Sequence, residues 1–437
     1  MEIKPFKAFR FNAAIVGDVC KCIAPPYDII TPAQQNQLYE VSKYNIVRIT
    51  RGKTTPSDDN TDNPYTRAAR YFDNWLKECA LKQDPTEAIY AYVQDFEVFG
   101  TKFKRLNFIA LARLEELGPP GPVRPHEQTL NKPMTDRLIL KRATAADFGL
   151  VFMLYEDPKK IADKIIESAA TQNLLIDCLD DLNTRHRLFA ITAENDIKAV
   201  AKMMSDKTCI IADGHHRYTT GLMYSKETDN PAAKYQMLGF SNTCQDGLIV
   251  LAAHRLVGNL PSFCFKKLIA DLEQNFTVTC FQFDSPDAKT KAKQKMLAQL
   301  KAEYKRDKNA LGIYGADTFY VAVLKDKRAM DLVAPNKSAA WKSLDVAVLH
   351  KLILEKLLGI GEKQLASDSY VEYVKDTENA IDESIEKVDK GQKQIAFFMN
   401  APKIRQIQMV ADAGERLPQK STYFFPKMFS GLTINKL

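Results

Sequence analysis

Residues 208–226 constrain the fold of this chain more than any other stretch. The apolar run 208–212 predicts a buried strand, Asp213 and Gly214 follow it, and a helix is expected over 216–226. A glycine directly after a strand lets the backbone turn tightly and approach a ligand closely. Such a strand–turn–helix unit is typical of α/β proteins, which place ligands and catalytic groups at the carboxyl ends of strands.

Strand and helix patterns alternate through the rest of the chain. Apolar and polar residues alternate on both sides of Gly100, which predicts a hairpin, and several longer segments have helical spacing. Residues 22–30 read as a strand-like run that ends in a proline turn, and 118–125 as a rigid loop. The expected strands are 88–99, 103–114, 147–155, 318–324 and 394–399, and the expected helices are 65–81, 159–172, 265–275, 287–307, 341–358 and 370–390.

These patterns predict a mixed α/β protein, of the α+β kind, whose C-terminal half is the more helical. The GNLP stretch that begins at Gly258 breaks the pattern, so a boundary is expected near residues 257–262. We therefore expect an N-terminal catalytic domain at 1–258 and a C-terminal α/β domain at 259–437.

Composition narrows the function classes. Apolar runs such as Leu248–Ala253 are too short to cross a bilayer, and the N-terminal residues lack the features of a secretory signal, so a cytoplasmic location is expected without a membrane partner. The net charge of +7 is mild for 437 residues and the basic residues have acids nearby, which disfavours nucleic-acid binding. The 8 cysteines form no pair of CxxC knuckles, which disfavours a zinc ribbon and favours buried thiols in a reduced compartment.

The residues after the 208–212 strand suit an anionic ligand. The start of the helix directs free amide groups and a positive dipole at the turn, and Arg217 adds donors that match phosphate oxygens. His215 and His216 are adjacent, so one can meet a phosphate while the other packs or orients a neighbour. The alternative is a purely structural role, in which Asp213 caps the helix and the two histidines are partly exposed. Metal ligation by these side chains comes second, because adjacent histidines lack the usual i, i+4 spacing.

Two other stretches offer chemistry. In RPHEQTL, Glu127 stands beside His126 in a loop that proline makes rigid. Glu127 is a candidate general base or metal ligand, and the structural alternative is that it caps a nearby helix. Shortly after, Asp136 and Arg137 are expected to pair with each other.

Residues 414–423, GERLPQKSTY, nearly match a phosphate loop. Gln419 stands where the second glycine of G-x-x-x-x-G-K-[ST] belongs, so a true phosphate loop is rejected. Lys420, Ser421 and Thr422 still offer a cation and two hydroxyls to an anion, with an ordinary surface turn as the alternative.

The motifs carry a resemblance to known families. IADGHHRY resembles the phosphate-binding signature of the ParB/sulfiredoxin-like superfamily, especially its free-serine kinases, in which a PHEQ element precedes DGHHR and a PKTT-type stretch follows. Here Pro125–Gln128, Asp213–Arg217 and Gln419–Thr422 stand in that order. The whole chain also resembles the family of proteins of unknown function DUF1015, through PPYD at 25–28, HEQT, DRL, ADGHHRY and a terminal PQKSTYFFPK.

The resemblance implies a ParB/sulfiredoxin-like catalytic core with insertions and a kinase that uses ATP or ADP with Mg²⁺ to convert free L-serine to O-phospho-L-serine, in serine and cysteine metabolism. Glu127 would be the general base beside His126, and Asp213 would act through Mg²⁺ or the substrate. The implied phosphate-binding residues are Gly214, His215, His216, Arg217, Lys420, Ser421 and Thr422, and the candidates for the amino acid's charged groups are Asp28, Asn45, Arg48, Asp136 and Arg137.

Two other functions stay open. One is a ParB-like nucleotide-binding switch or partner protein without small-molecule chemistry. The other is a metal-dependent hydrolase built on His126, Glu127, Asp213 and His215. The sequence does not decide which nucleotide is the donor, which molecule accepts the phosphoryl group, or what the oligomeric state is.

Overall fold

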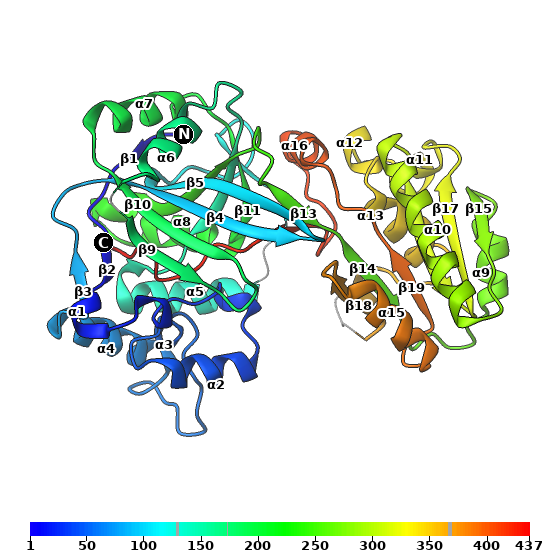
Figure 1. Ribbon diagram of the computed structural model, residues 1–437, viewed down its shortest axis with the longest axis horizontal. Helices are drawn as coiled ribbons and strands as arrows, with labels where there is room; N and C mark the ends of the chain where they lie inside the picture. Colours follow the sequence, from blue (N-terminus) through cyan, green and yellow to red (C-terminus); the bar gives the residue numbers. More distant parts are fainter. Residues whose placement is uncertain (128–130, 173, 366–368) are drawn as a thin grey trace. The chain divides into compact units, whose positions relative to one another are not determined.

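A computed structural model describes residues 1–127, 131–172, 174–365 and 369–437. The chain is divided into two compact units (Figure 1), one formed by residues 1–249 with 426–437 and the other by 250–425. The division at 258/259 stays a prediction about functional domains. The first compact unit, unlike the expected domain 1–258, also contains residues 426–437. There β21 (Asn435–Lys436) pairs with β7 (Ala146–Asp147).

Unit 1 is built on a mixed sheet with the strand order β6-β11-β8-β12-β5-β4-β10-β9, in which β1 also pairs with β5. The expected hairpin around Gly100 is confirmed, because β4 and β5 pair antiparallel from Tyr90↔Ile109 to Val98↔Thr101. The strands are β1 (Ile3–Lys4), β4 (Ile89–Val98), β5 (Thr101–Arg113), β6 (Val123–Pro125), β8 (Val151–Tyr155), β9 (Leu174–Leu179), β10 (Arg185–Ile191), β11 (Cys209–Asp213) and β12 (Tyr235–Asn242), with a separate pair β2 (Phe9–Phe11) and β3 (Leu81–Gln83).

Helices of unit 1 bury apolar side chains against this sheet and against one another. One core joins β4, β5, β8 and β11 to α6 and α7 through residues such as Phe108, Met153 and Ile166. A second core, around Phe72, Trp75 and Phe148, unites the N-terminal helices. The helices are α1 (Ala13–Val16), α2 (Pro32–Val41), α3 (Val47–Thr50), α4 (Pro64–Lys77), α5 (Asn131–Thr144), α6 (Ile161–Ala169), α7 (Glu194–Met204) and α8 (His215–Glu227), with short turns η1 (Val19–Lys21), η2 (Tyr27–Ile29) and η3 (Pro231–Lys234).

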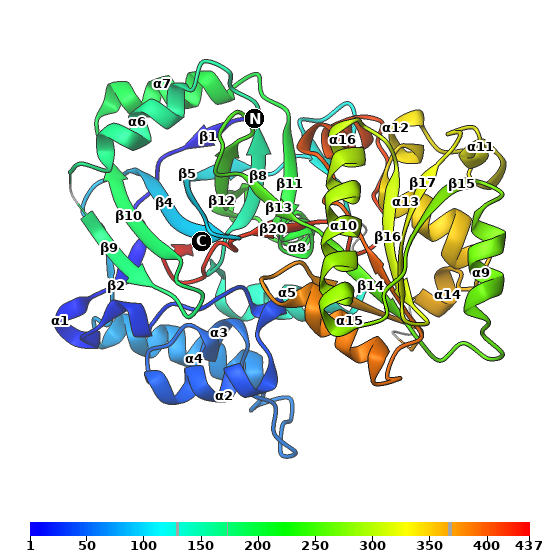
Figure 2. The ribbon, with the colours of Figure 1, turned by 45° about the vertical axis from the view of Figure 1, so that its right-hand side comes forward.

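Unit 2 has an antiparallel sheet with the strand order β15-β17-β16-β19-β14-β18. Figure 2 shows α10 and α15 against this sheet, where Met296, Leu300 and Ile385 join its core. Its elements are β14 (Ala253–Val257), α9 (Phe265–Leu272), β15 (Phe276–Phe281), α10 (Pro286–Lys305), β16 (Ala310–Gly315), β17 (Thr318–Leu324), α11 (Ala329–Val333), α12 (Ala339–Lys342), α13 (Asp345–Val348), the π-helix Leu349–Glu355, α14 (Glu362–Leu365), β18 (Val371–Lys375), α15 (Ala380–Asp389), β19 (Ile395–Phe398) and α16 (Ile404–Asp412); β13 (Ile249–Leu251) and β20 (Tyr423–Phe425) form a separate pair.

The mixed α/β class is confirmed, while some expected elements differ from the structure. The expected helix 370–390 is wrong in its first part, because Val371–Lys375 forms β18 beside β14 and the helix begins at Ala380. Residues 22–30 contain no regular strand; Ala24 makes an isolated bridge to Ser430 and a short turn follows. The assignment to the ParB/sulfiredoxin-like superfamily stays a prediction.

The expectation of buried free thiols is wrong for five of the eight cysteines, two of them bonded and three exposed. Cys20 and Cys178 form a disulfide with a Cα–Cα distance of 5.3 Å, although 158 positions separate them. Cys22 and Cys209 are buried free thiols, whereas Cys79, Cys264 and Cys280 are exposed. Within the described residues, every helix is too short or too polar to span a membrane.

Candidate functional site

Two neighbouring strands bring two of the sequence motifs together. β6 and β11 pair in parallel, with Pro125 opposite Ile211. The carboxyl ends of parallel neighbours lie at the same edge of a sheet, so the residues that follow each strand meet there. His126 and Glu127 follow β6, and Asp213 ends β11. The motifs PHE and DGHHR, far apart along the chain, therefore share one edge of the sheet.

Gly214 forms the turn between β11 and α8. Its φ of +88° lies in the left-handed region that favours glycine. A Cβ atom here would lie 2.9 Å from Nε and Nη2 of Arg217, so a side chain would displace the guanidinium. The glycine thus lets the first turn of α8 fold back against Asp213, as the strand–turn–helix pattern predicts.

Asp213 is held between two cations. Its Oδ1 accepts a hydrogen bond from Nζ of Lys427 at 2.6 Å, and its Oδ2 accepts one from Nη2 of Arg217 at 2.8 Å. Burial alone would raise the pKa of the Asp213 carboxyl, but Lys427 and Arg217 lower it to about 2. Asp213 is therefore an anion throughout the neutral range and fixes both cations at the edge of the sheet.

Lys427 is positioned by the buried face of the hairpin. Arg105, fully buried, donates from Nη2 to the carbonyl of Pro426 and from Nε to Oε1 of Gln94 at 3.1 Å. Gln94 in turn donates from Nε2 to the carbonyl of Lys427 at 3.1 Å. These bonds hold the carbonyl groups of Pro426 and Lys427. The backbone at the lysine is therefore fixed, and its ammonium group is positioned against Asp213.

His126 and His215 lock the two loops to each other. The backbone N–H groups of His126 and Glu127 both donate to Nε2 of His215, at 3.2 and 3.3 Å. Nδ1 of His126 lies 2.6 Å from the carbonyl oxygen of Ile211, to which it donates. Both rings are buried and meet edge to face at 4.7 Å. These two histidines position Glu127 beside the Asp213 turn.

A cavity of about 330 Å³ opens at this edge of the sheet, and both motifs line it. Burial lowers the pKa of His216, an effect that the Asp28 carboxylate opposes. His216 is therefore neutral at neutral pH and can donate or accept a hydrogen bond in the cavity. The lining residues are Tyr27, Asp28, Glu127, Asp213, Gly214, His215, His216 and Arg217.

Tyr27 also lines a second cavity, of about 720 Å³, beside the first. Its ring lies 3.9 Å from the guanidinium carbon of Arg137. Arg137 donates to Asp136 Oδ2 at 2.7 Å and to the carbonyl of Thr50 at 2.7 Å, and Asp136 accepts from the hydroxyl of Tyr65 at 2.8 Å. The expected pairing of Asp136 with Arg137 is confirmed, and both residues line the larger cavity.

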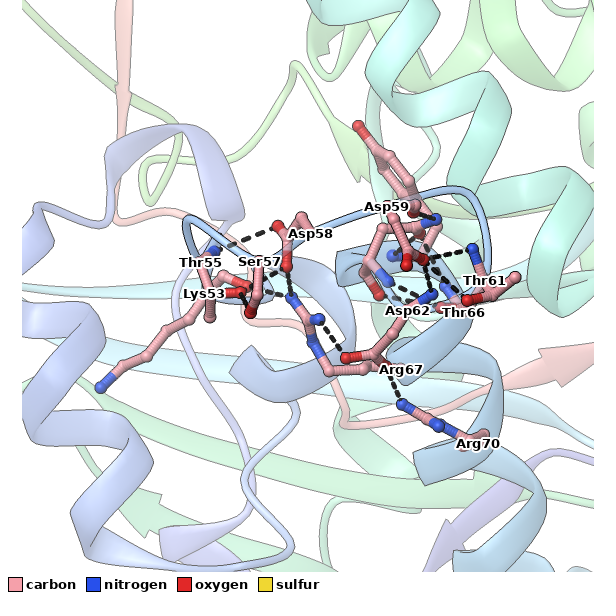
Figure 3. Close-up of polar contacts among 12 residues, drawn as sticks. Lys53, Thr55, Ser57, Asp58, Asp59, Thr61, Asp62, Thr66, Arg67 and Arg70 are labelled. Atoms are coloured by element: carbon pink, nitrogen blue, oxygen red, sulfur yellow. Dashed lines mark hydrogen bonds and ion pairs between the residues drawn. The ribbon is translucent and has the colours of Figure 1, made fainter.

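The loop between α3 and α4 forms part of the rim of this larger cavity, through Gly52 and Thr54. Figure 3 shows how Arg67 of α4 holds the loop: it donates to the Lys53 carbonyl at 2.8 Å, to Asp58 at 2.8 Å and to Asp62 at 3.1 Å. A single arginine therefore connects the helix to the start, middle and end of the loop.

Other predicted site residues lie elsewhere. Asn45 is buried just before α3, donating from Nδ2 to the carbonyls of Lys21 and Ile23 and accepting from the backbone N–H of Val47. Arg48 packs on the ring of Tyr39 at 4.4 Å. The two side chains thus stabilise the N-terminal helices, and neither lines the cavity that contains Glu127.

Lys420, Ser421 and Thr422 belong to unit 2. The Lys420 carbonyl accepts from Nη2 of Arg255 at 3.1 Å, and the Ser421 hydroxyl donates to the carbonyl of Pro418. Their part in a phosphate site stays a prediction. Gln128 and Thr129 of the PHEQT stretch lie outside the described residues.

The described residues contain no group of three or more His, Cys, Asp and Glu side chains placed to hold a metal ion. Both oxygens of Asp213 already face cations, and Nε2 of His215 accepts from the backbone. These contacts do not fit a protein-built cage for Mg²⁺ or zinc around Asp213.

Sequence reasoning missed Lys427 and Tyr27. Lys427 is the last residue of PQKSTYFFPK, a stretch in which the phosphate-loop-like pattern points to Lys420, Ser421 and Thr422 instead. Tyr27 is the aromatic residue of PPYD, of which only Asp28 was singled out. Both residues stand in stretches that carry the family resemblance, which was the available signal.

The comparisons with known proteins agree with that resemblance. The family model described as "Protein of unknown function (DUF1015)" matches residues 3–347. No curated protein matches the chain. The chain is similar in structure to a free serine kinase in complex with AMP, with 12% identity, a TM-score of 0.34 and coverage of 72% of this chain and 86% of that one.

Two other solved structures are similar at the same level. One is SbnI with a C-terminal truncation from Staphylococcus aureus, with 9% identity, a TM-score of 0.35 and coverage of 75% of this chain and 87% of that one. The other is a conserved hypothetical protein from Pyrococcus furiosus, with 14% identity, a TM-score of 0.31 and coverage of 73% and 92%.

Proposed function

The chain belongs to the family of proteins of unknown function DUF1015, and we propose that it is a nucleotide-dependent kinase that phosphorylates free L-serine to O-phospho-L-serine. One observation carries the proposal. The carboxylate of Glu127 lines the same cavity as the Gly214 turn, the first residues of α8 and Arg217. Phosphoryl transfer needs this combination, a group that accepts the proton of the alcohol beside groups that bind phosphate oxygens.

The residues divide into two roles. The amino end of α8, with its positive dipole, lines the cavity and would bind the phosphates of ATP or ADP with His216 and Arg217. Nε of Arg217 is buried and pairs with no other described residue. Lys427 and Asp213 keep that guanidinium in place.

Glu127 would act on the acceptor. It would take the proton of the serine hydroxyl as the serine oxygen bonds to the terminal phosphorus. The bond from that phosphorus to the bridging oxygen breaks, and ADP or AMP leaves with the electron pair. Mg²⁺, held chiefly by the nucleotide's own oxygens, would neutralise the phosphate charge. Asp28, Asp136 and Arg137, near Tyr27, are the proposed partners of the ammonium and carboxylate of serine.

The experiment incubates the full chain with Mg²⁺, ATP or ADP, and each proteinogenic amino acid in turn, with products identified by mass. We expect O-phosphoserine from one of the two nucleotides. E127Q should bind nucleotide as the parent does and lose at least about a hundredfold in turnover, as expected when a general base is removed. E116Q is the matched control, because Glu116 is an exposed carboxylate paired with Lys226.

The same experiment separates the other functions. Nucleotide binding without any phosphorylated acceptor would contradict the kinase and favour a nucleotide-binding switch. E127Q turnover equal to that of E116Q would remove Glu127 from the chemistry. Turnover that requires zinc and no nucleotide would favour the hydrolase.

A further inference from the structure

Unit 2 has a cavity of its own at one end of its sheet. β19 ends at Phe398, and it runs antiparallel to β14 and β16, which begin at Ala253 and Ala310. These strand ends therefore meet at the same edge. A cavity of about 230 Å³ lies there, lined by residues from the strand ends, from the α12–α13 junction and from α16.

The walls of this cavity are charged and predominantly basic. Two acidic side chains line it, Asp307 and Asp345, and Asp307 is already paired with Lys403 at 2.5 Å and with Arg405 at 2.7 Å. The basic side chains outnumber them, so the cavity favours a ligand with net negative charge. These basic residues are Arg255, Lys308, Lys327, Lys403 and Arg405.

Asp345 differs from Asp307 in its partners. Its carboxylate accepts hydrogen bonds from amide groups: Nδ2 of Asn309 at 2.7 Å, Nδ2 of Asn400 at 3.4 Å and the backbone N–H of Ala310. Burial raises the pKa of the Asp345 carboxyl to about 6, and the hydrogen bonds from Asn309 and Asn400 offset this only in part. A carboxylate in this position would be stabilised by a cationic donor, such as an ammonium group.

Two polar atoms on the same walls pair with no group among the described residues. Oδ1 of Asn309 is a buried acceptor without a donor, and Nε of Arg255 is a buried donor without an acceptor. Buried polar groups in native proteins are nearly always paired. The walls therefore lack a donor for Oδ1 of Asn309 and an acceptor for Nε of Arg255, and a ligand bearing both kinds of group could supply them.

We infer that this cavity binds an α-amino acid with an anionic side chain. Its ammonium group would meet Asp345 and Oδ1 of Asn309, and its two anionic groups would meet the basic walls. At about 30 Å³ for each water-sized group, the volume holds roughly eight such groups, close to the size of such an amino acid. This site is separate from the proposed phosphate cavity, whose lining residues all belong to unit 1.

The test is calorimetric titration of the full chain near neutral pH. The probes are L-aspartate, L-glutamate and O-phospho-L-serine, which distinguish a carboxylate side chain from a phosphate. Succinate lacks the ammonium group and L-asparagine lacks the second anion. We expect at least one of the three acidic amino acids to bind at least about tenfold more tightly than both, since each lacks one charge-assisted contact.

Variants locate the binding. D345N should weaken it about tenfold or more, because a neutral amide accepts from ammonium less strongly than a carboxylate. A401L fills the cavity from its lining without changing charge, and should abolish binding. D317N, at an exposed turn of the same unit with a φ of +54° that asparagine tolerates, is the matched control and should bind as the parent does.

Three results would overturn the inference. One is the absence of binding of all three amino acids at millimolar concentration, as for a cavity that holds only water. Another is succinate that binds as tightly as L-aspartate, which would remove the role of the ammonium group. The last is binding that survives in A401L but is lost in E127Q, which would assign it to the phosphate cavity of unit 1 whether or not that cavity supports kinase activity.

Discussion

Replacing Lys427 with methionine removes the cation nearest to the Asp213 carboxylate and keeps most of the apolar volume of the side chain. The lysine ammonium lies 2.6 Å from Oδ1, and both side chains are largely buried, with 9% and 16% exposure. The cations lower the pKa of Asp213 from 3.8 to about 2 against the opposing effect of burial. That net shift corresponds to about 2 kcal/mol at neutral pH, and the loss of one partner of a buried pair costs about 3 kcal/mol or more when no second cation remains.

We therefore expect K427M to lower the free energy of unfolding of unit 1 by about 2 kcal/mol, because Arg217 remains as the second cation. The assay is urea unfolding followed by tryptophan fluorescence. The sequence has 2 tryptophans, and the buried Trp75 and Trp341 lie one in each unit. In a W341F background the signal thus reports unit 1 alone. K436M, at an exposed lysine of the same C-terminal segment, is the control.

The pH dependence has a defined sign. A carboxyl whose folded pKa is lowered contributes stability above its unfolded pKa, and loses it as the pH falls through the folded value. In K427M the Asp213 carboxyl should protonate at higher pH than in the parent. The difference in free energy of unfolding between the two proteins should therefore become smaller as the pH falls from neutral toward the usual carboxyl range. A double-mutant cycle with D213N supplies the coupling energy, and a value below about 0.5 kcal/mol would refute the argument.

Further predictions concern other features. G214A should reduce nucleotide affinity and cost about 1 kcal/mol or more, since alanine is strained at a φ of +88° and its Cβ would displace Arg217; a parent-like dissociation constant in fluorescence titration would contradict this. D345N should stabilise unit 2 near neutral pH by roughly 3 kcal/mol, because a carboxyl with a folded pKa of about 6 lowers the free energy of unfolding as the pH rises from about 4 to 6; urea unfolding of a W75F background should show a gain that vanishes at acid pH. R67A should speed amide hydrogen exchange in the loop 53–63 while R70A, at a more exposed arginine on the same helix, should leave it nearly unchanged; equal rates in the two would show that Arg67 does not hold the loop.

Local patterns predicted the elements that depend on nearby residues. The hairpin around Gly100 and the strand 318–324 have alternating apolar residues and a turn, and both are present as expected. Residues 370–390 show the limit of such patterns. Helical spacing extends over the whole segment, but Val371–Lys375 gains ladder hydrogen bonds from β14, more than a hundred positions away, and forms a strand. A local pattern contains no information about that partner.

The candidate site shows the same division. The Gly214 turn was predictable because strand, glycine and helix are contiguous. The ion pair between Asp213 and Lys427 joins residues 214 positions apart, and the Cys20–Cys178 disulfide joins residues 158 positions apart. The link between the PHE and DGHHR motifs depends on β6, a strand of only 3 residues that is too short to give a periodic signal. The resemblance implies one site for these motifs, whereas the contacts that join them link residues far apart along the chain, which no local pattern contains.

The return of residues 426–437 to unit 1 has a consequence for biosynthesis. A ribosome completes Asp213 and its turn early, but Lys427 emerges only after the entire second unit has been translated. Until then a nascent chain must hold a buried anion with Arg217 alone, so the first unit cannot mature in the order in which it is made. Truncated products that end before this lysine should accumulate as chaperone clients rather than as a folded half.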